Sequence, residues 1–473
     1  MRQTVLVAGV LVAVAFASVQ AQRPPISNNI RRFVTVDAPV VALTHANVLD
    51  GTGASARNDQ TLIIRDGRIA VIGASASTPV PEGATVVDLT GKTVMPGMVM
   101  VHEHLYYPTG PGVYGQLGES FVQLYLAGGV TSMRTGGNVH GTMDINMKRL
   151  IEAGSKAGPW MDATAPYLNG SNTFQQMRVL SGPDDARKQV NYWADEGATS
   201  FKAYMNISRD DLAAAISEAH KRGLKVTGHL CSVTYAEAAE LGIDNLEHSF
   251  MAATDFVADK KPNACPGQAV GQKTIAGLDP KSPQFLALVK TLIDMGVSLT
   301  TTPAVFETFT PGRPLPPGLE VLTPQLKEQF EQTHARTAKS ANSIYSTLFM
   351  KGLELDLAFF RAGGKLVAGT DPTGSGGVIP GFSNQRTIEI LVEAGFTLPE
   401  AIQVVTLNGA RYLGRDQITG SLVVGKQADL VVLNGDPTST ISDVRKVETV
   451  FKQGVGFDSA RLIANVAGRV GIF

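Results

Sequence analysis

The sequence predicts an α/β protein, a (β/α)8 TIM barrel with a small β-sandwich domain built from both ends of the chain. Between Met98 and about Gly420, eight short apolar segments typical of strands alternate with segments of helical pattern. Segments rich in β-branched residues and turns lie on both sides of this region. The chain has 473 residues, which is too long for one ordinary core and favours one large and one smaller domain.

The chain begins with a segment typical of a secretory signal peptide. Arg2 is followed by an apolar run at 5–17. A signal peptidase cut after Ala21 would have the apolar Val19 at position −3 and the small Ala21 at position −1. An uncleaved membrane anchor is the alternative, but the run is short for spanning a bilayer. We therefore expect residues 1–21 to be removed and the mature protein to be exported, periplasmic or secreted, without membrane association.

The small domain is predicted from two distant stretches, residues 38–96 and 421–473. Both contain short β-rich runs, and the pair Asp66-Gly67 between two such runs is typical of a tight hairpin. Because each stretch is small for a core of its own, we expect them to combine into one β-sandwich.

Residues 97–420 form the predicted barrel. One connecting helix is well marked, because Ser208 with Asp211 resembles a capping box and Gly223 follows the last turn. A doubly wound sheet is the alternative, since alternation of strands and helices does not show that a barrel closes. The strand candidates in chain order are MVMVHEH, GVTSMRTGG, PWMDATAP, ATSFKAYM, LKVTGHL, NLEHS, VSLTTTPA and KLVAGTDP.

Two stretches rich in Pro and Gly, 257–285 and 303–325, are predicted to be long loops after the sixth and seventh strands. Loops at that end of a barrel usually shape a binding site. Cys231 and Cys265, the chain's two cysteines, are expected at the same rim. In an oxidising compartment they can form a disulfide, and the alternative is a free Cys231 packed under the site.

The composition restricts the class of protein. Charged residues make up 18% and hydrophobic residues 44% of the chain, as in a packed soluble protein. The formal net charge is −1 and there is no long basic run, so a nucleic-acid partner has no electrostatic support.

Several residues that can bind a metal fall at the ends of the strand candidates. Active sites of barrels form at the C-terminal ends of the strands. A single such histidine is often a core residue, and an aspartate before proline is often a turn former. Several on one rim indicate a metal centre instead. These residues are His102 and His104 after the first strand, Lys202 in the fourth, His229 after the fifth, His248 after the sixth and Asp371 after the eighth.

The motifs MPGMVMVHEHL, FKAYM, TGHL, LEHS, GTDP and GSLVVGKQADLVVL, in this order, resemble the amidohydrolase superfamily of metal-dependent hydrolases. The resemblance covers nearly the whole chain after the signal segment. It is closest to the branch that holds imidazolonepropionase, Xaa-Pro dipeptidases and aryl-amide hydrolases. It implies that His102 and His104 bind one metal and that His229 and His248 bind a second.

The resemblance also implies roles for the two remaining residues. Lys202 would be N6-carboxylated and would bridge two divalent ions. Zinc is expected for these ions, because neutral imidazoles suit it best. Asp371 would bind metal and act as the catalytic acid and base. A hydroxide bridging the ions would then attack the amide carbonyl, while Asp371 takes a proton and returns it to the leaving nitrogen.

The expected function is an exported metal-dependent amidohydrolase. Its substrate would be a small molecule with a C–N amide bond, such as a dipeptide, an N-acyl amino acid or a cyclic amide. The alternatives are an esterase or lactonase on the same site, a centre with a single metal, and a catalytically inactive exported binding protein. The sequence leaves open the substrate, the metal and whether the chain forms a homo-oligomer.

Two further residues are candidates for substrate binding. Tyr204 lies two residues beyond Lys202 on the same side of the strand, so it either contacts substrate or lines the barrel mouth. His140 follows the second strand in a loop at the same face. Glu103 points to the opposite face and is expected to pack or to form a supporting hydrogen bond. The histidines expected to be structural or exposed are His45, His220 and His334.

Overall fold

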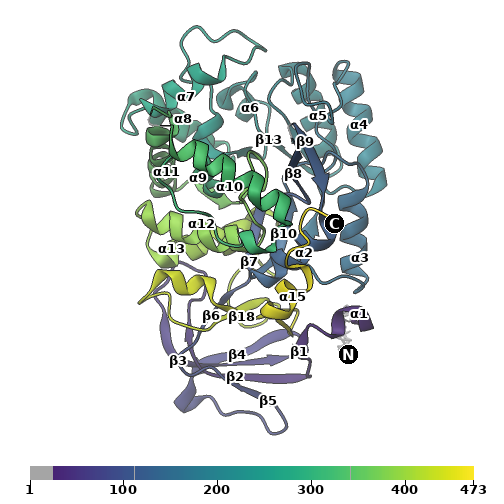
Figure 1. Ribbon diagram of the computed structural model, residues 1–473, viewed down its shortest axis with the longest axis vertical. Coiled ribbons are helices and arrows are strands. Elements are labelled where there is room, and N and C mark those ends of the chain that lie inside the picture. Colours follow the sequence, from purple (N-terminus) through teal and green to yellow (C-terminus); the bar gives the residue numbers. More distant parts are fainter. Residues whose placement is uncertain (1–24, 111, 341, 473) are drawn as a thin grey trace, which may run out of the picture.

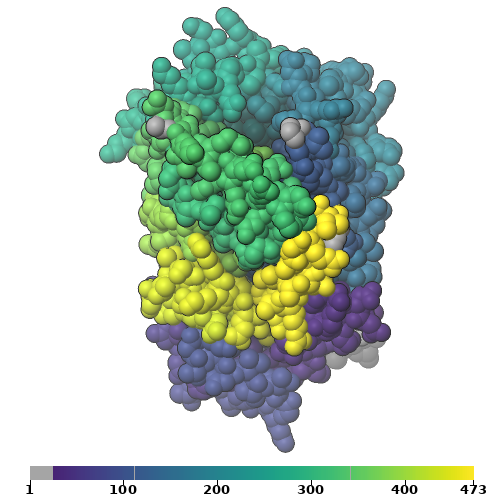
Figure 2. Space-filling model, in the orientation of Figure 1, coloured from purple at the N-terminus to yellow at the C-terminus, as the bar shows by residue number. Residues whose placement is uncertain are grey.

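The computed structural model describes residues 25–110, 112–340 and 342–472, and it has two parts (Figure 1). A mixed β-sheet occupies one end of the molecule, and a larger α/β body occupies the other. The C-terminal residues lie between the two parts on the face shown in Figure 2. The predicted signal segment, residues 1–21, lies outside the described residues. Within the described part of the chain, no helix has the length and apolar character needed to cross a membrane.

The smaller part is a nine-stranded sheet to which both ends of the chain contribute. Its order is β1-β19-β18-β17-β6-β2-β3-β4, with β5 beside β2. The predicted hairpin is confirmed, since Asp66 and Gly67 join β3 to β4 with φ of +49° and +75°. The strands are β1 (Val34–Val36), β2 (Val40–Val48), β3 (Arg57–Arg65), β4 (Arg68–Ala74), β5 (Thr85–Asp88), β6 (Thr93–Pro96), β17 (Leu430–Leu433), β18 (Val447–Lys452) and β19 (Val455–Asp458).

The hydrogen bonding of this part differs from the expected sandwich. All nine strands belong to one sheet, because β6 pairs with β17 and joins the two ends of the chain. Apolar side chains of both ends still share one core, to which Leu62 and Ile64 contribute from β3 and Val432 and Phe451 from β17 and β18. A strongly twisted sheet of this size can curl around its own core, so a second separate sheet is not required.

The α/β body contains all eight predicted strands, in the predicted order and all parallel to their neighbours. They form two sheets of order β11-β10-β7 and β12-β13-β14-β15-β16. The strands are β7 (Met98–Glu103), β10 (Val130–Thr135), β11 (Trp160–Asp162), β12 (Ser200–Ala203), β13 (Lys225–Gly228), β14 (Asn245–Glu247), β15 (Ser298–Thr301) and β16 (Lys365–Ala368).

The two sheets meet at two seams, which gives a TIM-barrel-type arrangement. At one seam, Thr164 and Ser200 form an isolated parallel bridge, and their hydroxyl oxygens are 2.8 Å apart. At the other, the backbone N–H of Thr370 donates to the carbonyl of His102 at 3.1 Å. Because isolated bridges and a few backbone hydrogen bonds replace a regular ladder at both seams, the described strands do not form one continuous closed sheet.

Helices surround the strands of the body. The predicted helix is confirmed as α5, since Ser208 Oγ accepts a hydrogen bond from Asp211 N at 3.1 Å and Gly223 follows with a φ of +67°. A short hairpin of β8 (Tyr106–Gly110) and β9 (Val113–Gln116) follows β7. The helices are α1 (Asn28–Arg31), α2 (Gly118–Ala127), α3 (Met143–Glu152), α4 (Pro183–Glu196), α5 (Arg209–Lys221), α6 (Tyr235–Glu240), α7 (Gln268–Ala276), α8 (Pro283–Asp294), α9 (Pro303–Thr308), α10 (Pro324–Ala338), α11 (Tyr345–Arg361), α12 (Phe382–Glu393), α13 (Leu398–Gln403), α14 (Gly409–Tyr412) and α15 (Ser459–Val466).

The two stretches predicted as long loops, 257–285 and 303–325, contain helices, and this prediction was wrong in part. The first holds α7 and the start of α8, and the second holds α9 and the start of α10. Pro283, Pro303 and Pro324 each begin one of these helices. The first turn of a helix leaves its N–H groups without partners inside the helix, so proline is favourable there. Proline, which favoured the loop prediction, marks the start of a helix in these three places.

Candidate active site

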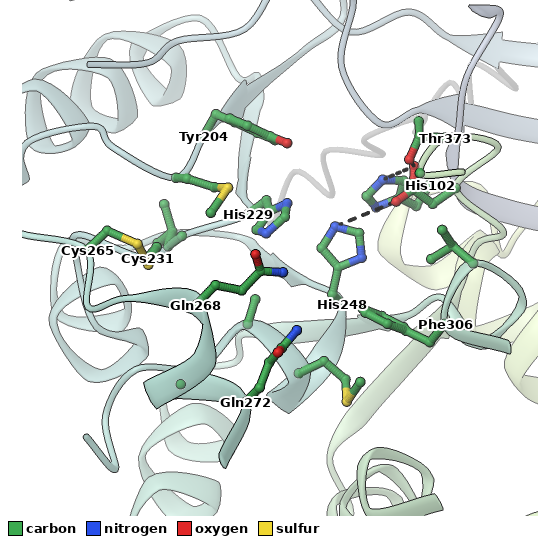
Figure 3. A pocket seen from close by; sticks show the side chains of 18 of the residues that line it. His102, Tyr204, His229, Cys231, His248, Cys265, Gln268, Gln272, Phe306 and Thr373 are labelled. Carbon is green, nitrogen blue, oxygen red and sulfur yellow. Dashed lines mark hydrogen bonds and ion pairs between the residues drawn. A yellow bond between two sulfur atoms is a disulfide. The ribbon is translucent and has the colours of Figure 1, made fainter. Parts of the chain in front are cut away.

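A cavity of about 450 Å³ opens at the C-terminal ends of the parallel strands. The structure brings all six predicted metal-binding residues to its wall, although they span 269 positions of the chain, from 102 to 371. Figure 3 shows that three of the histidines, from different strand ends, face the same space. We call this part of the wall the inner end of the cavity. Its residues are His102, His104, Lys202, His229, His248 and Asp371.

The imidazole rings of the inner end form a continuous group. The ring centroid of His102 lies 5.2 Å from that of His104 and 4.8 Å from that of His248. The ring centroids of His229 and His248 are 4.3 Å apart. Asp371 Oδ1 is 3.2 Å from His104 Nε2 and 3.7 Å from His102 Nε2. His102, His104 and Asp371 each offer one ligand atom, and these atoms lie within 4.8 Å of one another. Nitrogen and oxygen donors at this separation can share one divalent ion.

Burial sets the protonation of these histidines. It lowers the pKa of His104 to about 4 and that of His229 to about 3, and it lowers the pKa of His248 well below its ordinary value. Three imidazoles are therefore neutral near pH 7, which is the form that binds a metal. His102 differs, because burial lowers its pKa but the carboxylates of Glu247 and Asp371 outweigh burial and raise it.

Two residues of the inner end have an unusual backbone conformation. His248 and Asp371 have φ of +62° and +54°, a region that residues with a Cβ seldom occupy. Side-chain hydrogen bonds hold both residues. His248 Nδ1 is 2.8 Å from Thr302 Oγ1, and Thr373 Oγ1 donates to Asp371 Oδ1 at 2.8 Å. Strained backbone of this kind is concentrated at functional sites.

Lys202 is buried in strand β12, with only 1% of its surface exposed. Its Nζ lies 3.4 Å from Glu247 Oε1. Burial nevertheless lowers the pKa of Lys202 to about 8, so a larger share of the amine is uncharged near neutral pH than in an exposed lysine.

Sequence reasoning missed Glu247, the buried carboxylate that links several residues of the inner end. Its Oε2 lies 2.6 Å from His102 Nδ1, and its Oε1 accepts hydrogen bonds from Arg134 and from Thr227. Arg134 is itself fully buried and also donates from Nε to the carbonyl of Val101 at 2.8 Å. A signal was present, because an arginine and a glutamate inside two apolar strands are costly unless they pair.

The expected supporting role of Glu103 is confirmed. Its carboxylate accepts hydrogen bonds from Thr370 N at 3.1 Å and from Asn384 Nδ2 at 2.9 Å. Burial raises the pKa of Glu103 to about 7. Since Thr370 precedes Asp371, these bonds tie strand β7 to the turn that carries the aspartate.

The two candidates for substrate contact differ in position. Tyr204 lines the cavity, its ring centroid lies 5.0 Å from that of His229, and its hydroxyl points into the space (Figure 3). His140 is exposed and does not line the cavity, and its Nε2 contacts the carbonyl of Tyr114 at 3.0 Å. The geometry therefore argues against His140 as a substrate contact.

The three histidines expected to lie away from the site do so. His45 Nδ1 is 2.8 Å from Asp59 Oδ1, and His220 Nε2 is 3.0 Å from Asp244 Oδ2. His334 contacts a backbone carbonyl through Nε2 at 3.2 Å. These contacts are structural.

A disulfide joins Cys231 and Cys265, which confirms the pairing and excludes a free Cys231. Their Cα atoms are 4.8 Å apart, and both residues line the cavity (Figure 3). The bond connects the end of strand β13 to the segment that leads into α7. Closing a chain segment of 34 residues stabilises the folded state by about 4 kcal/mol in the chain-entropy model.

Comparison with known proteins points to one superfamily. Residues 355–456 match the model of the amidohydrolase family. The chain is 24% identical over 436 residues to an imidazolonepropionase of Mesorhizobium japonicum, a match that covers 88% of this chain and 95% of that relative. It is 27% identical over 182 residues to an enamidase of Eubacterium barkeri, which covers 36% of this chain and 44% of that relative, less than half its length.

A solved structure supports the fold. The crystal structure of a Xaa-Pro dipeptidase with bound methionine in the active site superposes with a TM-score of 0.66 at 19% identity. The match covers 89% of this chain and all of that chain, 100%. This chain and the dipeptidase structure thus share one architecture, a TIM-barrel-type body with a separate sheet. The family match over residues 355–456 and the full-length similarity to an imidazolonepropionase support the amidohydrolase superfamily and an enzyme that hydrolyses carbon–nitrogen bonds.

Proposed function

We propose that this protein is an exported metal-dependent amidohydrolase that cleaves the C–N amide bond of a small substrate at the inner end of the cavity. The observation that carries the proposal is the convergence of six donor residues from separate strand ends on one enclosed space. The disulfide between Cys231 and Cys265 supports export, because such bonds persist in oxidising compartments.

The donor set fits a pair of divalent cations, with zinc favoured. Three neutral imidazoles suit zinc, and carboxylate-type oxygens suit bridging or terminal positions. His102 can also present a ring nitrogen to a metal. Its Nδ1 faces Glu247, and its Nε2 points toward Asp371. The residues that would hold the ions are His102, His104, Lys202, His229, His248 and Asp371.

Lys202 would take part as an N6-carboxylated lysine. An ammonium group repels cations, whereas the uncharged amine reacts with carbon dioxide to give a carbamate anion. The lowered pKa of Lys202, about 8, increases the uncharged share of the amine near neutral pH. Carboxylation would also remove the cost of a buried ammonium group.

Asp371 is placed to move the proton of the reaction. Burial raises its pKa, but His102 and His104 outweigh burial and hold the pKa of Asp371 well below its ordinary value, so the carboxylate is ionised. The bound ions would supply Lewis acidity, which acidifies a water molecule and polarises the scissile carbonyl. Asp371 would take the proton of that water on a carboxylate oxygen and deliver it to the leaving nitrogen.

Metal analysis of the purified protein, paired with turnover on dipeptides, acyl amino acids and aryl amides, tests the proposal. We expect two equivalents of zinc, loss of hydrolysis after chelation and recovery with added zinc. His229→Ala should lower metal content, and His220→Ala, outside the cavity, is the matched control. Undiminished hydrolysis by the metal-free protein, or two bound ions in His229→Ala, would contradict it.

A further inference from the structure

We infer that the natural substrate is an uncharged amide with an aromatic body, and that amides with a free carboxylate are discriminated against. This inference rests on the proposed function and names its substrate class. It follows from the wall of the cavity beyond the inner end, which we call the outer end. The outer end is formed by the β8–β9 hairpin, the segment before α4, α7, α9 and the start of α11.

One wall of the cavity is a chain of aromatic rings. The ring of Tyr106 stacks on His104 at 4.4 Å between centroids, and its hydroxyl oxygen is 2.5 Å from that of Tyr167. Tyr204 lies 5.0 Å from Tyr167 and 6.3 Å from Phe174 in the same series. These rings offer flat apolar surface that begins beside the proposed metal ligands.

A second aromatic series lines the cavity on α9 and the start of α11. Phe306, on α9, lies 5.8 Å from the ring of His248, and Phe309 lies 6.4 Å from Phe306. Tyr345, at the start of α11, continues the series at 5.3 Å from Phe309. A planar aromatic group in contact with both series buries apolar surface.

Besides tyrosine hydroxyls, the polar groups of the outer end include two neutral amides on α7. Gln268 and Gln272 lie four positions apart, which places them on one face of the helix, and both side chains point toward the histidines in Figure 3. Gln272 Nε2 donates to Tyr345 Oη at 2.9 Å, which orients the amide. Carboxamides of this kind can donate to a carbonyl and accept from an N–H without requiring charge.

Among the described residues of the outer end, none offers a cationic side chain to a substrate carboxylate. Among the described residues that line the cavity, Lys202 is the one lysine and there is no arginine. Lys202 lies at the inner end beside Glu247 and is assigned to the metals. A carboxylate at the outer end, away from the proposed metals, loses hydration among the aromatic rings without gaining a charged partner, which opposes binding. Uncharged substrates have no such cost.

Matched substrates test the inference on the zinc-loaded full-length enzyme. The probes are phenylacetanilides that carry either a carboxylate or a carboxamide at a para position, one pair substituted on each ring. Both groups have nearly the same size, and they lie away from the scissile carbonyl. We expect kcat/KM for the carboxamide to exceed that for the carboxylate by at least about 10-fold in both pairs, since a buried unpaired charge is strongly disfavoured.

A charge added to α7 should change this preference. Gln268→Arg places a cation on the wall, so the carboxamide-to-carboxylate ratio should fall several-fold for the pair whose substituent reaches α7. Thr274→Arg adds the same charge on the same helix but outside the cavity wall, and it should retain the wild-type ratio. Equal or greater kcat/KM for both carboxylates in the wild type would overturn the inference.

The same probes separate this inference from the proposed function. If the wild-type enzyme hydrolyses no member of the pairs or of the wider amide panel, the proposed function fails. Calorimetric binding of the same pairs still decides the inference, because tighter binding of the carboxylate would overturn it and tighter binding of the carboxamide would support it.

Discussion

The two ends of the cavity are built in different ways. The inner end takes its side chains from strands or from the residues that follow them. Buried hydrogen bonds with Glu247 and Thr302 hold His102 and His248, and Glu103 holds the turn before Asp371. The outer end takes its side chains from connecting segments, several of them partly exposed, with the Cys231–Cys265 disulfide as a covalent anchor. In the proposed function, the chemistry thus depends on the sheets, and recognition depends on connections that can change without disturbing them.

Removal of the central residue of the inner end should have the largest effect. Lys202→Ala should leave at most one tightly bound metal and lower kcat by at least about 1,000-fold, because the water would lose its second cation. Lys202→Arg should fail as well, since guanidinium stays cationic. Metal stoichiometry beside turnover measures this. Lys365→Ala, an exposed lysine at the opposite end of a strand, should behave as wild type. Two metals and near-normal turnover in Lys202→Ala would remove the bridging role.

A positioning residue of the inner end should have the next largest effect. Glu247→Gln retains the size of the side chain but removes the charge that faces His102 Nδ1 at 2.6 Å. We expect metal affinity to fall about 10- to 100-fold, with a smaller loss of activity when zinc is saturating. Competition with a chelator measures the affinity. Glu240→Gln, on the exposed end of α6, is the control, and unchanged zinc affinity in Glu247→Gln would show that Glu247 only balances Arg134.

At the boundary between the two ends, Tyr204→Phe should have a moderate effect. Removing one hydrogen bond to an uncharged substrate costs about 0.5–1.5 kcal/mol, so kcat/KM should fall about 2- to 10-fold while metal content stays unchanged. Steady-state kinetics on the best neutral amide, with Tyr192→Phe on the outer surface as control, measures the loss. Kinetics equal to wild type would leave Tyr204 with a packing role.

The smallest effect on catalysis should come from the disulfide of the outer end. The double change Cys231→Ser and Cys265→Ser should raise KM a few-fold by loosening the segment before α7, while kcat and metal content persist. Stability should fall by up to about 4 kcal/mol, the chain-entropy value for a segment of this length. Thermal unfolding and steady-state kinetics measure the two quantities. A large loss of kcat or of zinc would show that the two ends are not independent.

The sequence alone was sufficient to predict the eight strands of the body and the six residues of the inner end. Strands appear as short apolar runs, and a polar residue directly after such a run must lie at the strand's end. Both are local properties, so neighbouring residues are enough to recognise them. The cap of α5 and the turn at Asp66-Gly67 were predicted for the same reason.

Other features depend on residues that are distant in the chain, and only the tertiary structure decided them. Arg134 and Glu247 are 113 positions apart, and their pairing becomes visible only when β10 and β14 lie in one body. The joining of β6 to β17 turned an expected sandwich into one sheet, and proline marked helix starts where loops were expected. The neutral aromatic wall is likewise assembled from separate connections, each of which alone shows only a few apolar residues. Local patterns therefore determined the elements and the candidate metal-binding residues, whereas long-range packing determined their partners and the shape of the space a substrate would enter.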